Sequence, residues 1–213
     1  MAESDWPAAS NLAAMPDPGD ALNELALQLR GERSVISPHV RSPDGQAPAL
    51  GVLVAGGPRA ADAPAEYAIL FESIREGYLL HYADARVVNG ADEDLALLAG
   101  DYLYARGLER LASLGDLQAV RELSDLISLA AQIHAANHAS PAADDGSGAL
   151  WLASAITVAA GPPSGHADAK RALRDGDPRA ATALWEGAVS VAEPAGLAER
   201  LDRAAESIGF RPH

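Results

Sequence analysis

The sequence predicts an all-α fold, an antiparallel helical bundle with short connections. Hydrophobic residues make up 48% of the 213 residues and aromatic residues only 5%, so the core must consist mainly of Leu, Ala, Val and Ile. Ala and Leu are strong helix formers. Apolar residues also recur at helical spacing, and glycine and proline divide the chain into segments of helix length. This length suits one domain, which we place at residues 19–213 after a flexible arm, residues 1–18, with three prolines.

Turn and cap signals place the elements of the first half of the chain. Residues 49–55 are an apolar run that fits a buried strand or a buried helix, and the helical surroundings favour a helix. Asn89-Gly90 is a strong turn signal after a long helix. The expected elements are, in order, a short helix capped by Asp20 and ended near Gly31, a loop over 31–48, a helix over 49–55, a long helix over 62–82 and a break over 83–91.

The second half begins with the two most strongly predicted helices, 92–114 and 116–138. The acidic start Asp92-Glu93-Asp94 favours a helix N-terminus, because carboxylates stabilise the positive end of the helix dipole. Gly115-Asp116 fits the C-cap of one helix and the N-cap of the next. The remaining elements are expected to be a loop over 139–148 and helices over about 149–160, 166–175, 178–192 and 195–208.

Composition excludes several classes of function. The formal net charge of −14 and the pI near 4.7 disfavour binding to nucleic acid and to anionic membrane surfaces. The sequence contains no cysteine, which rules out disulfides and thiolate chemistry. No apolar run is long enough for a membrane span, and the N-terminus lacks the basic start of a signal peptide, so we expect a cytoplasmic protein.

Two segments carry a family resemblance. Residues 77–81 read Gly-Tyr-Leu-Leu-His, and residues 97–106 read Leu-Leu-Ala-Gly-Asp-Tyr-Leu-Tyr-Ala-Arg. Together with Leu114-Gly115-Asp116 they resemble the trans-isoprenyl (polyprenyl) diphosphate synthase family over about 60 residues. In that family a helix ends in Leu-His directly before an Asp-Asp-x-x-Asp motif, and a later helix carries Ala-Gly-Asp-Tyr-Leu. The resemblance implies a bundle of the isoprenoid synthase type, and it weakens after residue 138.

The family's chemistry requires groups that this chain lacks. In such synthases two Asp-rich motifs hold Mg²⁺ ions that neutralise the diphosphate leaving group, and basic residues bind isopentenyl diphosphate. After His81 this chain has Tyr82-Ala83-Asp84-Ala85-Arg86 in place of the first motif. The segment Gly45-Gln46-Ala47-Pro48 lacks the family's basic residues, and the only other Asp-Asp pair, Asp144-Asp145, does not form a second motif. The bundle is therefore expected to be a degenerate and truncated member, with no metal ligands and no catalytic residues.

A chain that keeps the family's helix motifs but lacks its Asp motifs resembles the small noncatalytic subunit of heteromeric polyprenyl diphosphate synthases. The hypothesis is that the chain binds no cofactor, stabilises a catalytic subunit that holds the Mg²⁺, and helps to set product chain length. An obligate pair would bury on the order of 2,000 Å². The candidate interface residues are Leu97, Gly100, Asp101, Leu103, Tyr104 and Leu108, for which an ordinary intramolecular core is nearly as good an explanation. Alternatives are a stand-alone, homodimeric isoprenoid- or lipid-binding protein and an enzyme with a rebuilt site.

Overall fold

The computed structural model describes residues 17–43, 45–137 and 146–211, and these residues confirm the all-α prediction. They contain nine α-helices and no β-strand. The helices are α1 (Ala21–Gly31), α2 (Ala49–Ala55), α3 (Pro64–Tyr82), α4 (Glu93–Ser113), α5 (Leu117–Asn137), α6 (Ser147–Ala160), α7 (His166–Arg174), α8 (Ala180–Ala192) and α9 (Ala198–Ser207). None of them is long and apolar enough to cross a membrane.

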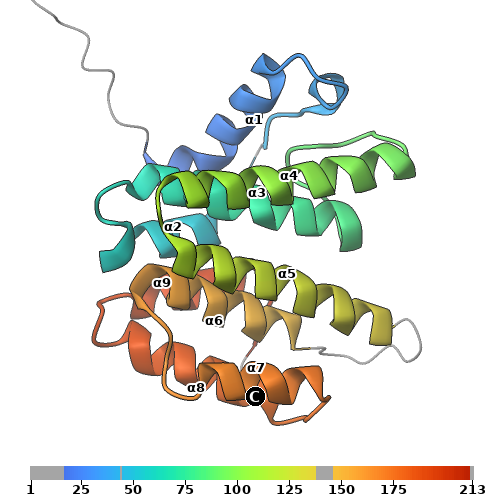
Figure 1. The fold of residues 1–213 in the computed structure, drawn as a ribbon. Coiled ribbons are helices and arrows are strands. Elements are labelled where there is room, and N and C mark those ends of the chain that lie inside the picture. The colour runs from blue at the N-terminus through green and yellow to red at the C-terminus, as the bar shows by residue number, and fades with distance from the viewer. Residues whose placement is uncertain (1–16, 44, 138–145, 212–213) are drawn as a thin grey trace, which may run out of the picture.

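The helices stack in tiers, with α1 at one end and α7 and α8 at the other (Figure 1). α4 packs along α3, and α5 packs against α6. α6 lies at the centre, because it contacts α2, α5, α8 and α9 and its residues 149–159 are all buried. Its Trp151 packs edge-to-face on Phe71 of α3, with ring centroids 5.8 Å apart. The centre of the core thus lies where α3 and α6 meet.

The predicted helix boundaries between α3 and α5 are confirmed by cap geometry. Asp92 accepts a hydrogen bond from the backbone N–H of Leu95 at 2.8 Å and so caps α4. Gly115 has φ +78° between α4 and α5, and Asp116 accepts from the N–H of Ala119 at 3.0 Å. A positive φ costs least at glycine, which explains why the break falls at this residue.

Two predictions for the N-terminal part need correction. Asp20 precedes α1 but makes no side-chain cap; instead Asp17 accepts from the N–H of Gly19 at 2.8 Å and begins a 3₁₀ turn. The segment 31–48 is more ordered than a plain loop, since Val40 and Val88 form an antiparallel bridge. The expected arm lies outside the described residues except for 17–18, and the expected loop 139–148 lies outside them except for 146–148.

Three glycines allow α3 and α4 to pack closely. A Cβ atom on Gly100 would lie 2.5 Å from Nε2 of His81, and one on Gly77 would lie 2.8 Å from the carbonyl oxygen of Gly100. A Cβ atom on Gly107 would lie 2.5 Å from Cγ1 of Ile74. A Cβ atom at any of these positions would force a neighbouring atom to shift. The glycine of the Ala-Gly-Asp-Tyr-Leu segment is thus explained by the close packing of two helices.

Candidate functional site

Residues 82–86, which the resemblance aligns with the first Asp motif, begin in the last turn of α3. Tyr82 ends that helix, and its ring stacks on His134 of α5 with centroids 4.1 Å apart. Ala83 and Asp84 are exposed. The side chain of Tyr82 is therefore packed between two helices, and the carboxylate of Asp84 lies outside this packing.

Arg86 turns back toward α3 and meets two fully buried carboxylates. Its Nη1 lies 2.7 Å from Oε2 of Glu72, and its Nε donates to Oε2 of Glu76 at 3.3 Å. Burial acts to lower the pKa of Arg86, but the charges of Glu72 and Glu76 outweigh burial and raise it. The guanidinium therefore remains charged and offsets the negative charge of the two buried carboxylates.

The backbone completes this buried cluster. Oε1 of Glu72 accepts from the N–H of Gly51 at 2.7 Å, which ties α2 to α3. Oε1 of Glu76 accepts from the N–H groups of Val87 at 2.6 Å and Val88 at 3.1 Å. Buried carboxylates are stable only when paired and hydrogen-bonded, and these contacts supply that requirement. The segment after α3 is thus held in place by two buried carboxylates of that helix.

A cavity of about 340 Å³ joins the two segments that the sequence singled out. Gln46 and Ala47, from the segment before α2, line one side, and Asp84, Ala85 and Arg86 line another. The Val40–Val88 bridge explains the proximity, because it attaches the chain before α2 to the chain after α3. The sequence identified both segments, but only the structure shows that they face one cavity.

Arg75 is a cavity residue that sequence reasoning missed. It lies on α3, and its guanidinium carbon sits 4.6 Å from the ring centroid of Tyr78 and 4.7 Å from that of Trp151. Burial lowers the pKa of Arg75, and the faces of the two rings partly replace water around its charge. The sequence signal that could have identified Arg75 is an arginine in a helix whose residues are mostly apolar.

The chemistry that the cavity can support follows from these pairings. The carboxylates of Glu72 and Glu76 are already paired with Arg86 and hydrogen-bonded to backbone N–H groups. Nη2 of Arg86 is buried and has no hydrogen-bond partner among the described residues, so it can donate to an anionic group. The described residues hold no group of three His, Asp or Glu side chains arranged to bind a metal ion.

The candidate interface residues do not share one exposed face. Leu103 is fully buried and Gly100 is covered by His81, so these two belong to the core of the chain, which is the alternative that the sequence left open. Tyr104 stacks on His81, with ring centroids 5.4 Å apart, and is half-buried. Leu108 is also half-buried against the core.

Leu97 and Asp101 are the candidate interface residues that the protomer leaves exposed. The sequence missed two neighbours on the same helix, Leu98 at 65% exposed and Tyr102 at 39%. Their spacing of four residues was the signal, because it places them one turn apart on one face. We call the set Val35, Leu97, Leu98 and Tyr102 the α4 patch, since these apolar side chains are all exposed.

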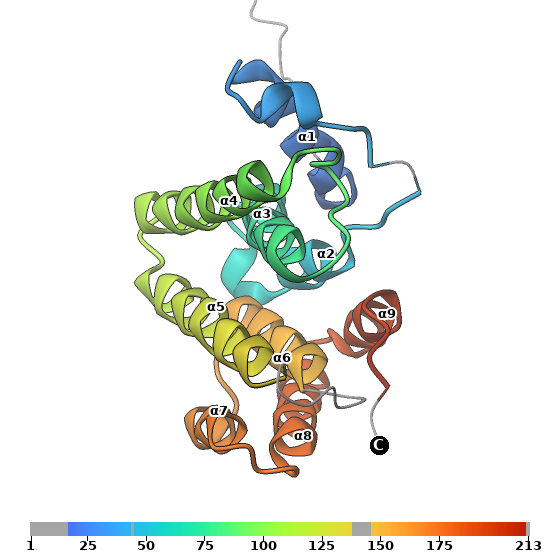
Figure 2. The ribbon, with the colours of Figure 1, turned by 90° about the vertical axis from the view of Figure 1, so that its right-hand side faces the viewer.

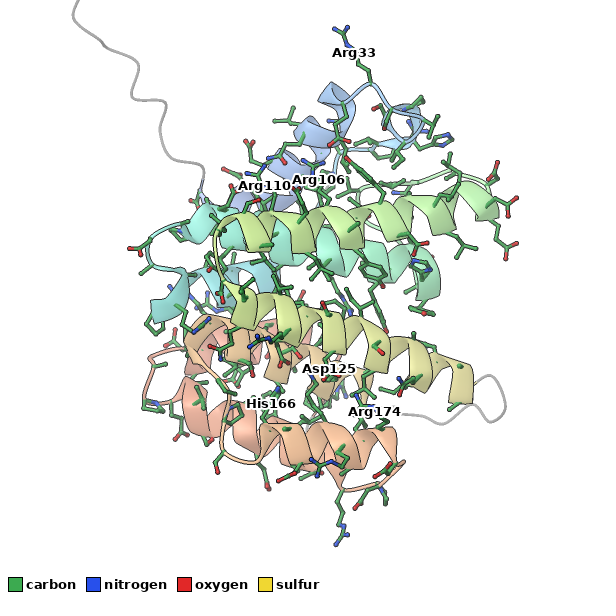
Figure 3. The ribbon with its side chains drawn as sticks, in the orientation of Figure 1. Arg33, Arg106, Arg110, Asp125, His166 and Arg174 are labelled. Carbon is green, nitrogen blue, oxygen red and sulfur yellow. The ribbon has the colours of Figure 1, made fainter. Side chains whose placement is uncertain are left out.

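The α4 patch borders a groove of about 410 Å³ between α4 and the turn after α1. Leu95 and Leu98 line one wall, and Val35 and Ile36 line the other. Arg33, the one described non-glycine residue with a positive φ, at +54°, projects at the tip of this turn (Figure 3). An exposed apolar surface beside a groove is a common feature of protein-binding sites.

Comparison with known proteins assigns no family to the chain: no family model, no curated protein and no solved structure matches it.

Proposed function

We propose that the chain is a noncatalytic subunit of a heteromeric trans-polyprenyl diphosphate synthase, which stabilises the catalytic subunit and helps to set the length of the product. The observation that carries this proposal is the position of Arg86 and its pairing with two buried carboxylates. At the last position of the degenerate motif, a cation replaces a metal-binding carboxylate and is held against Glu72 and Glu76. A Mg²⁺ ion would be repelled there, so the Mg²⁺-dependent step is assigned to the partner.

The α4 patch is the surface that the proposal assigns to the partner. Its three α4 side chains, Leu97, Leu98 and Tyr102, are exposed although apolar, and the acidic start of α4 flanks them. A partner with an apolar ridge bordered by basic residues would cover this surface. The patch shifts the interface from the α4 face that contains Leu103 to the adjacent exposed face.

Co-expression with the full-length synthase of the same cell tests the proposal. The two chains are expected to co-purify in a fixed ratio and to make a different product length from the synthase alone. Leu98→Glu should weaken co-purification at least tenfold, because it places a charge in the centre of an apolar contact. Leu117→Glu is the matched control, since Leu117 is similarly exposed at 56% but lies at the start of α5.

The result that would overturn the proposal is turnover by this chain alone. If the purified chain condensed farnesyl diphosphate with isopentenyl diphosphate in the presence of Mg²⁺, it would be an enzyme with a rebuilt site. Equal product lengths with and without the chain would remove the regulatory part of the proposal and leave only stabilisation of the partner to be tested.

A stand-alone isoprenoid-binding protein is the second candidate, and the cavity favours it. Arg75 and the free donor of Arg86 could hold a diphosphate without chemistry. It ranks second because Phe71, Tyr78 and Trp151 fill the space between α3 and α6 with packed rings. Native mass spectrometry separates the two candidates: a homodimer carrying lipid supports this one, and a complex with a synthase supports the first.

A further inference from the structure

Helix α7 is attached to the bundle by buried polar side chains as well as by Ala169 and Leu173, which are partly buried against the core. Its buried residues are His166 and Lys170, whereas its largest apolar residue, Leu173, is only half-buried. Lys170 is the only lysine among the 16 Lys and Arg residues of the chain, and it is 3% exposed. A surface helix ordinarily docks through an apolar stripe, and a lysine is almost never fully buried unless it is paired.

Lys170 is shared between two carboxylates of α5. Its Nζ lies 3.0 Å from Oε1 of Glu122 and 2.6 Å from Oδ2 of Asp125. Arg174, one turn further along α7, donates to Oδ1 of Asp125 at 2.9 Å. Figure 3 shows Asp125 on α5 above His166 and Arg174 on α7. His166, Lys170 and Arg174, at i, i+4 and i+8 on α7, therefore face an acidic pair at i and i+3 on α5.

Glu122 joins three helices through one oxygen atom. Its Oε1 accepts from Oγ of Ser154 on α6 at 2.6 Å and lies 3.0 Å from Nε2 of His166 on α7. Burial acts to raise the pKa of Glu122, but His166, Lys170 and Ser154 outweigh it and lower the pKa to about 2. The arrangement is not a catalytic triad, because Ser154 donates to the carboxylate and not to the imidazole.

His166 completes the cluster, and only one of its two ring nitrogens has hydrogen-bond partners among the described residues. Its Nε2 also lies 3.3 Å from Oγ1 of Thr157 on α6. Its Nδ1 is buried and has no hydrogen-bond partner among the described residues. Buried polar clusters that are not fully satisfied stabilise a structure weakly, although removing one partner of a buried ion pair is costly.

We propose that α7 is an ionically latched strap that opens locally while the rest of the bundle stays folded. The latch is the set Glu122, Asp125, His166 and Lys170. α7 lies at the edge of the outermost tier, packed against α8 and α5 (Figure 2), so the strap can lift without disturbing α3 or α4. Opening exposes the amine of Lys170 and the polar face of α5 and α6 around Glu122 and Ser154.

Because Lys170 is the only side-chain amine, its chemical labelling reports on the strap directly. The full-length chain is exposed to an amine-reactive acylating reagent, and peptide mass spectrometry separates Lys170 from the N-terminal amine. Native protein should label at Lys170 at least 100-fold more slowly than a free peptide of residues 166–174, in keeping with a closed latch. The rate should stay constant at low urea, because local opening exposes little surface.

Variants then assign the protection to the latch. Glu122→Gln should raise the labelling rate on the order of 100-fold, because Lys170 loses a buried counter-charge. Asp125→Asn is a milder second variant, since Asp125 is partly exposed, and should raise the rate by a smaller factor. Asp168→Asn is the control on the same helix, because it removes only the exposed pair with Arg171 and should leave the rate unchanged.

Three results would overturn the proposal that α7 opens locally. One is labelling of native Lys170 at the peptide rate. Another is a labelling rate that follows global unfolding from the lowest urea concentrations, since α7 would then open only with the whole bundle. The third is an equal rate in Glu122→Gln and Asp168→Asn, with circular dichroism showing that both variants are folded. None of these results bears on whether a synthase partner exists.

Discussion

At the scale of single residues, Arg86 lies between two buried carboxylates, and its charge is expected to matter for stability. Arg86→Met leaves Glu72 and Glu76 buried without their counter-charge. Breaking a buried pair in this way should lower the free energy of unfolding by about 3–5 kcal/mol. Urea denaturation followed by circular dichroism measures this loss. Arg203→Met, which removes an exposed partner of Glu199, is the control and should change stability by less than about 1 kcal/mol.

The lowered pKa of Glu122 predicts that the free energy of unfolding falls over a defined range of acidic pH. Its pKa is about 2 in the folded protein against an ordinary value of 4.5, so the folded state favours the ionised form. The stabilisation is therefore complete above pH 4.5 and is lost as the pH falls from 4.5 toward 2. The difference corresponds to about 3 kcal/mol. Glu122→Gln should flatten the fall in unfolding free energy over this range; an unchanged pH profile would contradict the assignment.

The residues of the site were only partly predictable. The family resemblance aligns Arg86 with the position of a metal-binding carboxylate, but it does not show where the side chain lies. Its partners Glu72 and Glu76 are spaced like any helical i, i+4 pair. Only the structure shows that their side of α3 is covered, by α2 and by the segment after α3. Burial of charge depends on tertiary contacts, which a single sequence does not contain.

At the scale of elements, the contact between α3 and α4 depends on glycine. Gly100→Ala would place a Cβ atom 2.5 Å from Nε2 of His81 and 3.0 Å from the carbonyl oxygen of Gly77, so that the imidazole of His81 must move. Overpacking of this kind should cost about 1–3 kcal/mol in the free energy of unfolding. Gly31→Ala is the matched control, because nothing lies within 4 Å of its Cβ position. That change should be neutral or slightly stabilising, since alanine favours helices. Thermal unfolding of both variants tests the contact, and equal midpoints would contradict it.

The elements themselves were predictable where periodicity and caps agreed. Asp92, Gly115 and Asp116 mark the ends of α4 and α5, and the structure confirms each of them. The error at Asp20 has a local cause, because Asp17 stands before Pro18 and begins the 3₁₀ turn first. The bridge between Val40 and Val88 joins residues far apart in sequence, which local pattern cannot reveal.

At the scale of the whole molecule, exposure decides which face can meet a partner. The sequence placed an interface on α4 but could not separate its inner from its outer face, because α4 carries apolar residues on both. The structure buries Leu103 and exposes Leu98 and Tyr102. The exposed side chains of the α4 patch are therefore the surface that the proposal assigns to a partner.

The mass of the native assembly tests the central claim most directly. The chain is isolated from its source cell without denaturation, and native mass spectrometry measures the particle that contains it. The account predicts one copy or more of this 22.0 kDa chain in a fixed ratio with a longer synthase that carries both Asp motifs. A particle made of this chain alone, as monomer or homodimer, in a cell that expresses such a synthase would contradict it.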